Sequence, residues 1–256
     1  MIRAVFFDID GTIMSHRTRS VPESARQAIR QLKEKGIRCV VATGRQLPEI
    51  DKLPCRDIDF DGYITMNGQL IFDAQKQEIR GTPVEGAFLE RSLAMFEARE
   101  YPVLLVEKDR MYLNFVNDHV VKAQEDISSA VPPIDTYSGA PLYQICVYLT
   151  EAQMDCVAAM EDCCSINRWH WGGADLVTKG MDKRTGIQEY LEANGIKPEE
   201  AMAFGDGDND VEMLRYVGIG VAMGNGTDAA KAAADYITSD IDEAGIANGL
   251  RHFGIL

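Results

Sequence analysis

The sequence has neither a long hydrophobic run nor a run of basic residues. Its apolar stretches fall well short of the roughly 20 residues that span a bilayer, and its first residues lack the pattern of a signal peptide. We therefore expect a cytoplasmic protein. The formal net charge is -14, and nucleic acids and anionic membranes bind clustered Lys and Arg. We expect neither as a partner, although a small anionic substrate stays compatible with this charge.

Cysteine is sparse, and its spacing excludes the usual structural uses. The chain has six cysteines and no Cys-x-x-Cys pair, so neither a zinc site nor a disulfide framework is indicated. We interpret all six as reduced thiols. Cys163 and Cys164 are neighbours, and the sequence assigns them no role.

A large apolar fraction is present. Hydrophobic residues make up 46% of the 256 residues, enough for one large domain or for a core with an inserted second domain. Near the N-terminus, an apolar run ending at Phe7 is followed by a helical stripe over Val21 to Lys35 and a second run over Ile37 to Ala42. This strand, helix and strand pattern predicts an α/β fold with a doubly wound parallel sheet.

The middle of the chain has a different pattern. From about Pro83, strands arrive in neighbouring pairs between helices, which is typical of an α+β unit. The alternating pattern resumes after Gly180. We predict a core domain over residues 1–82 and 181–256, with an inserted α+β cap domain over residues 83–180.

Two acidic clusters directly follow apolar strands. The first is Asp8-Ile9-Asp10-Gly11-Thr12, and the second, after the strand Ala201 to Phe204, is Gly205-Asp206-Gly207-Asp208-Asn209-Asp210. Ligands of open parallel sheets bind at the carboxyl ends of the strands, so both clusters and Thr43 should gather at one edge. Oxygen ligands from Asp8, the Asp10 region and Asp206 suit Mg²⁺.

The residues alone leave alternatives open. Either acidic cluster could be an ordinary polar loop. Lys183 stands at the start of a predicted helix, where it could bring positive charge to the same edge or could simply be solvated.

The motifs taken together resemble those of a known family. In order, they resemble the four motifs of the haloacid dehalogenase superfamily of phosphohydrolases: Asp8 to Thr12, Thr43-Gly44-Arg45, Lys183, and Gly205 to Asp210. The large insertion after the second motif, with Asn67-Gly68 and Met223-Gly224-Asn225-Gly226, is similar to the Cof-type sugar phosphatases of subfamily IIB. One departure is Arg184, where many relatives have Gly.

The resemblance implies a phosphoric monoester hydrolase with two catalytic aspartates. Asp8 would attack phosphorus and form an aspartyl-phosphate. Asp10 would protonate the leaving group and later accept a proton from the attacking water. The implied Mg²⁺ ligands are Asp8, the main-chain carbonyl of Asp10 and Asp206, supported by Asp210. The implied phosphoryl-binding residues are Thr43, Gly44, Lys183 and Asn209.

The resemblance favours small sugar phosphates, hexose or pentose, as substrates. Alternatives are a phosphorylated cofactor such as flavin mononucleotide or pyridoxal phosphate, or a phosphomutase that uses the same intermediate. A signalling receiver with a phosphorylated aspartate is an alternative outside enzymes, although a receiver needs no inserted domain. We expect a monomer or a weak homo-oligomer.

Overall fold

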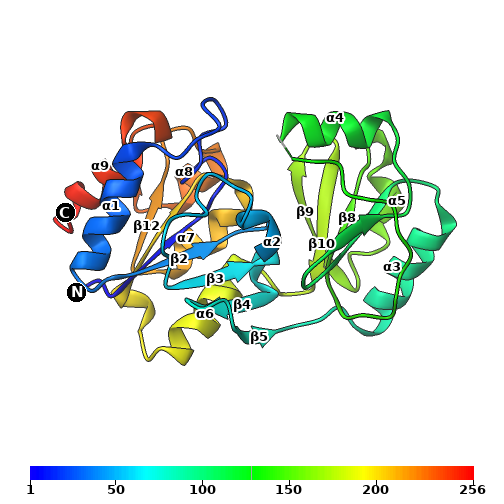
Figure 1. Cartoon of the computed structure of the whole chain (residues 1–256), viewed down its shortest axis with the longest axis horizontal. Coiled ribbons are helices and arrows are strands. Elements are labelled where there is room, and N and C mark those ends of the chain that lie inside the picture. Colours follow the sequence, from blue (N-terminus) through cyan, green and yellow to red (C-terminus); the bar gives the residue numbers. More distant parts are fainter. Residues whose placement is uncertain (128) are drawn as a thin grey trace. The chain divides into compact units, whose positions relative to one another are not determined.

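The computed structural model describes residues 1–127 and 129–256, without the side chain of His170. The described residues form two compact units. The first combines Met1–Arg80 with Asp182–Leu256, and the second, mainly green in Figure 1, is Gly81–Met181. The first unit is therefore built from both ends of the chain.

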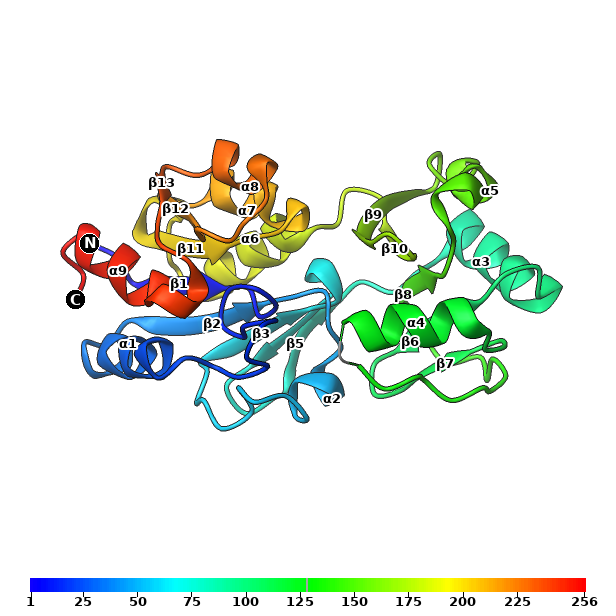
Figure 2. The same ribbon diagram turned by 90° about the horizontal axis from the view of Figure 1, so that it is seen from above.

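The first unit contains an eight-stranded sheet in the order β13-β12-β11-β1-β2-β3-β4-β5. Its strands are β1 (Ala4–Phe7), β2 (Arg38–Ala42), β3 (Gly62–Thr65), β4 (Leu70–Asp73), β5 (Glu78–Gly81), β11 (Ala201–Gly205), β12 (Ile219–Ala222) and β13 (Tyr236–Ile237). From β13 to β3 each neighbouring pair is parallel, whereas β4 runs antiparallel to β3. Figure 2 shows β1 between β2 and β11, which come from opposite ends of the chain. The predicted α/β class is confirmed.

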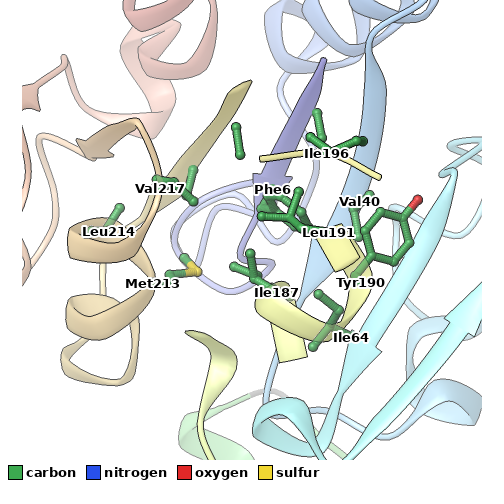
Figure 3. Packing of buried hydrophobic residues seen from close by; sticks show 14 of the residues in the cluster. Phe6, Val40, Ile64, Ile187, Tyr190, Leu191, Ile196, Met213, Leu214 and Val217 are labelled. Atoms are coloured by element: carbon green, nitrogen blue, oxygen red, sulfur yellow. The ribbon is translucent and has the colours of Figure 1, made fainter. Parts of the chain in front are cut away.

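Helices cover both faces of this sheet. Successive residues of β1 point to opposite faces, and because all four are apolar and buried, each face needs a covering layer. Phe6 meets the ring of Tyr190 edge-on at 5.8 Å, within a cluster to which α6 (Lys183–Ala193) and α7 (Val211–Tyr216) contribute (Figure 3). Phe7 stacks on Phe204 at 5.5 Å on the other side. There α9 approaches closely, since a Cβ at Gly249 would lie 2.7 Å from Phe204. The helices of this unit are α1 (Glu23–Glu34), α2 (Leu47–Ile50), α6 (Lys183–Ala193), α7 (Val211–Tyr216), α8 (Asp228–Ala233) and α9 (Gly245–His252).

The second unit has its own sheet, five-stranded and antiparallel wherever its pairs are described, in the order β7-β6-β8-β10-β9. Its elements are β6 (Val103–Glu107), β7 (Met111–Leu113), β8 (Leu142–Val147), β9 (Cys164–His170), β10 (Gly173–Thr178), α3 (Gly86–Ala98), α4 (Asp118–Asp126) and α5 (Asp155–Ala158). A separate hydrophobic cluster joins α3 and α5 to this sheet. The pairing of sequence neighbours confirms the expected α+β pattern.

Short 3-10 turns complete the described secondary structure. They are η1 (Met66–Gly68), η2 (Glu151–Gln153), η3 (Pro198–Glu200), η4 (Asp208–Asp210) and η5 (Ile241–Glu243). In the part of the chain that the structure describes, none of the helices has the length and apolar character needed to cross a bilayer.

Candidate active site

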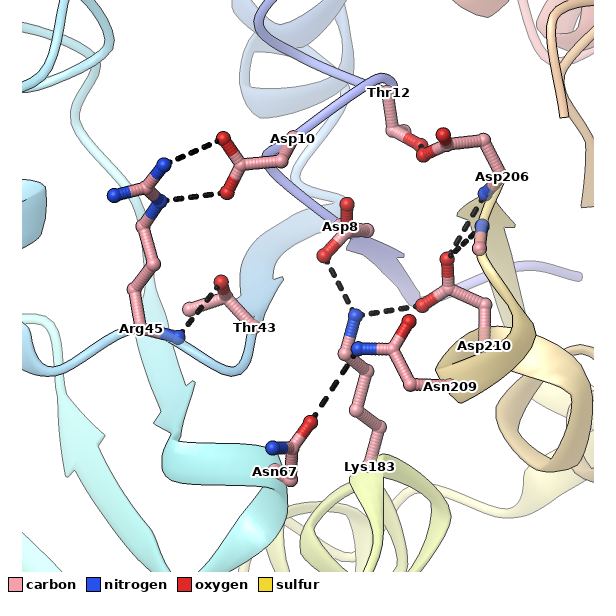
Figure 4. Close-up of polar contacts among 11 residues, drawn as sticks. Asp8, Asp10, Thr12, Thr43, Arg45, Asn67, Lys183, Asp206, Asn209 and Asp210 are labelled. Atoms are coloured by element: carbon pink, nitrogen blue, oxygen red, sulfur yellow. Dashed lines mark hydrogen bonds and ion pairs between the residues drawn. The ribbon is translucent and has the colours of Figure 1, made fainter. Parts of the chain in front are cut away.

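Polar residues follow three neighbouring strands at the same edge of the first sheet. Asp8 comes directly after β1, Thr43 directly after β2, and Asp206 directly after β11. Because β1 is parallel to both neighbours, the carboxyl ends of all three strands lie together. Figure 4 shows these residues close together, with the Lys183 ammonium between Asp8 and Asp210.

Lys183 joins two of the carboxylates. It is the first residue of α6, a start that Asp182 caps by accepting a 2.8 Å hydrogen bond from the Thr185 amide. The Lys183 Nζ donates to Asp8 Oδ1 at 2.6 Å and to Asp210 Oδ1 at 2.7 Å. Burial opposes the charge of Lys183, but Asp210 and Asp8 outweigh it and raise the lysine pKa. The lysine is therefore a buried ammonium, with a side chain only 1% exposed.

Asp210 also shapes the loop that carries Asp206. Its Oδ2 accepts hydrogen bonds from the backbone N–H groups of Asp206 and Gly207, both at 2.9 Å. Because Lys183 occupies its other oxygen, both carboxylate oxygens of Asp210 already have partners. Asp210 thus connects the lysine to the second acidic cluster.

Asp206 packs closely against the first acidic loop. Its Oδ1 accepts a 2.8 Å hydrogen bond from the Thr12 hydroxyl. Gly11 has φ +86°, and a Cβ at this position would lie 2.1 Å from Asp206 Oδ2. Only glycine fits here, because any side chain would meet both backbone strain and the carboxylate.

Asp10 is held by an arginine rather than by the lysine. Arg45 donates to both of its carboxylate oxygens, from Nε at 2.6 Å and from Nη2 at 2.8 Å. Burial alone would raise the pKa of Asp10, but the charge and hydrogen bonds of Arg45 outweigh it and lower the pKa. Asp10 is therefore ionised in this arrangement.

The remaining predicted residues follow β2 and β11: Thr43 and Gly44 come after β2, and Asn209 lies in η4. Thr43 is buried, and its hydroxyl accepts a 3.2 Å hydrogen bond from the Arg45 amide. Gly44 lies beside the Asn67 side chain, which a Cβ at Gly44 would approach to 3.3 Å. Asn209 donates from Nδ2 to Asn67 Oδ1 at 3.4 Å. The structure thus brings every predicted site residue to one edge of the sheet.

The donor set fits a hard divalent cation. Oxygens of Asp8, Asp206 and Asp210 lie within 4.8 Å of one another. Among the described residues, Lys183 bonds to one oxygen of Asp8, and Thr12 bonds to one oxygen of Asp206. Each of these two carboxylates therefore has a second oxygen that could bind the cation. Two carboxylates with room for water or phosphate oxygens are typical of Mg²⁺ sites.

The electrostatics of the site point the same way. Burial and the nearby charge of Asp210 raise the pKa of Asp206 to about 7. Burial raises the pKa of Asp8 well above its ordinary value, because Lys183 offsets only part of the burial and of the repulsion from Asp210 and Asp206. A divalent cation among these carboxylates would relieve that repulsion.

Sequence reasoning gave no role to three residues that the structure places in the site. Thr12 and Arg45 were noted only as parts of the first and second motifs, and Asn67 only as part of the similarity to Cof-type phosphatases. The position of Arg45 directly after Thr43-Gly44 was the available signal. Spacing alone could not reveal its partner, because Asp10 lies 35 residues away.

Comparison with known proteins identifies the family. The family model described as haloacid dehalogenase-like hydrolase matches residues 5–250. The chain belongs to this family. The putative phosphatase YkrA of Bacillus subtilis is 31% identical over 257 aligned residues, covering 99% of this chain and 98% of YkrA. The family and this relative make the chain a haloacid dehalogenase-like phosphatase, a phosphoric monoester hydrolase that acts on small phosphomonoesters.

Solved structures of the superfamily have the same fold. The phosphatase BT1666 from Bacteroides thetaiotaomicron matches with a TM-score of 0.91 and 30% identity, covering 100% of this chain and 96% of BT1666. The subclass IIB sugar phosphatase BT4131 matches with a TM-score of 0.87 and 36% identity, covering 99% of this chain and 100% of BT4131.

A more distant relative by sequence is the pyridoxal phosphate phosphatase YbhA of Escherichia coli. It is 24% identical, and the alignment covers 93% of each chain.

Proposed function

We propose that this protein is a Mg²⁺-dependent phosphatase of small sugar phosphates that works through an aspartyl-phosphate on Asp8. The observation that carries the proposal is the position of Asp8. It is buried at the end of β1, it accepts a 2.6 Å hydrogen bond from Lys183, and it lies beside Asp206. A carboxylate so enclosed is poised to react with an electrophile rather than to interact with solvent.

In the first step, an oxygen of Asp8 attacks phosphorus while the bond from phosphorus to the ester oxygen breaks. Asp10 gives its proton to the departing alcohol oxygen. Since Arg45 stabilises the ionised form of Asp10, we propose that Asp10 takes up this proton from solvent only after it has separated from Arg45. The products of this step are the alcohol and phosphorylated Asp8.

In the second step, water attacks the phosphorus of the aspartyl-phosphate. Asp10 takes the proton of this water, and the bond from phosphorus to the Asp8 oxygen breaks to release inorganic phosphate. Pairing with Arg45 keeps Asp10 ionised, which is the state that a general base requires.

The phosphoryl group carries negative charge that the site must stabilise. Lys183 supplies a buried positive charge, and Thr43, Gly44 and Asn209 supply polar groups around it. Asp8, the Asp10 carbonyl and Asp206 would hold Mg²⁺, with Asp210 supporting. Bound there, Mg²⁺ would neutralise charge on the phosphoryl oxygens.

We further propose that the Gly81–Met181 unit is the cap that selects the alcohol part of the substrate. Its separate sheet and hydrophobic cluster support an independent domain. A cap that closes over bound substrate would exclude water from the first step. The sugar phosphatase BT4131, at 36% identity, supports a sugar phosphate more strongly than the 24% identical YbhA supports pyridoxal phosphate.

Phosphate release from a substrate panel tests the proposal. The panel contains hexose and pentose phosphates, flavin mononucleotide and pyridoxal phosphate, each assayed with and without Mg²⁺. We expect sugar phosphates to give the highest kcat/KM, with activity only when Mg²⁺ is present. A clear preference for either cofactor would contradict the sugar phosphate assignment. An isomeric sugar phosphate without free phosphate would indicate a phosphomutase instead.

Two variants test the nucleophile. Asp8→Asn should abolish turnover while the far-UV circular dichroism of the protein stays unchanged. Asp208→Asn is the matched control, because Asp208 is an exposed carboxylate of the second acidic cluster that bonds to Thr227 at 2.7 Å. It should retain activity. Full activity of Asp8→Asn would refute the nucleophile assignment.

A further inference from the structure

We propose that Asn225 is a positioning residue that fixes the spacing of the two halves of the metal site and thereby favours Mg²⁺ over Ca²⁺. The inference rests on the proposed function, because it concerns the ion that Asp8 and Asp206 would hold. Asn225 lies in the loop after β12 and touches neither carboxylate through any hydrogen bond that the structure describes.

The side-chain amide of Asn225 forms a two-ended bridge. Its Nδ2 donates to the carbonyl oxygen of Gly11 at 2.8 Å. Its Oδ1 accepts from the backbone N–H of Ile241 at 2.9 Å. Gly11 directly follows Asp10 in the first acidic loop, so the bridge ties that loop to η5 through Asn225, which lies 214 residues from Gly11.

The loop after β12, which carries Asn225, also bonds to the second acidic cluster. The backbone N–H of Thr227 donates to the carbonyl oxygen of Asp206 at 2.8 Å, and that of Met223 donates to the carbonyl oxygen of Gly205 at 2.9 Å. The segment Met223–Thr227 therefore contacts the backbone of both acidic loops. Its hydrogen bond through Asn225 reaches the loop of Asp8, while those of Met223 and Thr227 reach the loop of Asp206.

An amide is the side chain that this bridge requires. At position 225 one end must donate to a carbonyl oxygen and the other must accept from an N–H. Aspartate could still accept from Ile241, but it would place a second oxygen against the Gly11 carbonyl. Alanine would lose both hydrogen bonds.

The bridge lies on the wall of a cleft of about 490 Å³, which Gly11 and Asp206 also line. Asn225 is exposed there. Truncating it therefore leaves no buried cavity, and the folded state should survive the change.

The two ions differ in their tolerance of ligand spacing. Mg²⁺ requires near-ideal octahedral geometry at about 2.0–2.1 Å, whereas Ca²⁺ accepts a flexible shell at about 2.3–2.6 Å. Loss of the bridge would loosen the spacing between the two acidic loops. Mg²⁺ should lose more affinity than Ca²⁺, and residues that orient metal ligands typically contribute about 10–100-fold in affinity.

Metal binding to the substrate-free protein tests this inference. Bound and free Mn²⁺ are counted by electron paramagnetic resonance while Mg²⁺ or Ca²⁺ displaces the Mn²⁺, which gives the ratio of the two dissociation constants. For Asn225→Ala we expect about 10-fold weaker Mg²⁺ binding and a smaller loss for Ca²⁺. For Asn225→Asp we also expect the ratio of the Mg²⁺ to the Ca²⁺ dissociation constant to rise, since the added charge attracts both divalent ions alike.

Asn194→Ala is the matched control. Asn194 donates a 2.8 Å hydrogen bond from its amide to the Tyr190 carbonyl at the end of α6, away from both acidic loops. Its ratio should equal that of the wild type. An unchanged ratio in both Asn225 variants, with wild-type metal binding intact, would overturn the inference alone. Failure of the wild-type protein to bind either ion would overturn the proposed function as well.

Discussion

Removing the positive charge of Lys183 should destabilise the protein far more than removing an exposed positive charge that forms an ion pair of similar length. Lys183→Met leaves Asp8 and Asp210 facing each other without the ammonium that bonds to both, at 2.6 and 2.7 Å. The side chains of Lys183 and Asp210 are each 1% exposed. Breaking a buried ion pair by removing one partner typically costs about 3–5 kcal/mol, because the other charge stays buried without compensation.

The matched control is Arg215→Met. Arg215 pairs with Glu212 at 2.8 Å in the same unit, but the two side chains are 58% and 53% exposed. Exposed pairs contribute less than about 1 kcal/mol. For a domain of this size about 1 kcal/mol shifts Tm by about 2–4 °C, so Lys183→Met should lower Tm by roughly 6–20 °C and Arg215→Met by a few degrees at most.

Differential scanning calorimetry at pH 7 without metal measures both shifts. The double variant Lys183→Met with Asp210→Asn should recover part of the loss, because it removes one of the two uncompensated charges. The deficit of Lys183→Met should also narrow as the pH falls and the remaining carboxylates take up protons. Equal Tm shifts for Lys183→Met and Arg215→Met would refute the argument that the buried charges are interdependent.

Two further predictions concern one residue in each unit. Gly11→Ala should abolish Mn²⁺ binding because its Cβ would collide with Asp206. The control Gly36→Ala, at φ +73° with open space around it, should cost about 1–2 kcal/mol of backbone strain and leave Mn²⁺ binding intact. Equal Mn²⁺ affinities in both variants would contradict the predicted collision. Glu107 accepts a 2.7 Å hydrogen bond from Arg110, which lowers the Glu107 pKa. Its stabilisation is present above the ordinary pKa of about 4.3 and is lost as the pH falls through the lowered value. Glu107→Gln should therefore be less stable than the wild type at pH 7, and the difference should narrow as the pH falls below about 4.3. Urea unfolding followed by the fluorescence of the two tryptophans, both in the same unit as Glu107, measures this, and a constant difference between pH 7 and pH 3 would contradict it.

The backbone of the site could be predicted from sequence because its signals are local. Each apolar strand changes abruptly to polar residues at Asp8, Thr43 and Asp206, and parallel pairing then fixes the edge at which they meet. The polar pattern also indicated that Asp8, the Asp10 region and Asp206 suit a cation. The structure places oxygens of Asp8 and Asp206, together with Asp210, within 4.8 Å of one another.

The partners of individual side chains could not be predicted in the same way. Arg45 bonds to Asp10, and Asn225 bonds to Gly11, across separations of 35 and 214 residues. Both contacts depend on how loops pack after the sheet has formed, and residue spacing carries no record of that packing. The side-chain contacts of Asn67 could not be predicted from residue spacing either. Its backbone is left-handed (φ 54°) within the tight turn of η1.

The covalent intermediate is the central claim, and borohydride trapping tests it most directly. Borohydride reduces an aspartyl-phosphate to homoserine, which peptide mass spectrometry can locate in the sequence. During turnover of a sugar phosphate with Mg²⁺ present, we predict homoserine at position 8 and none when the substrate is omitted. Turnover without homoserine at this position, or homoserine at another aspartate, would contradict the account.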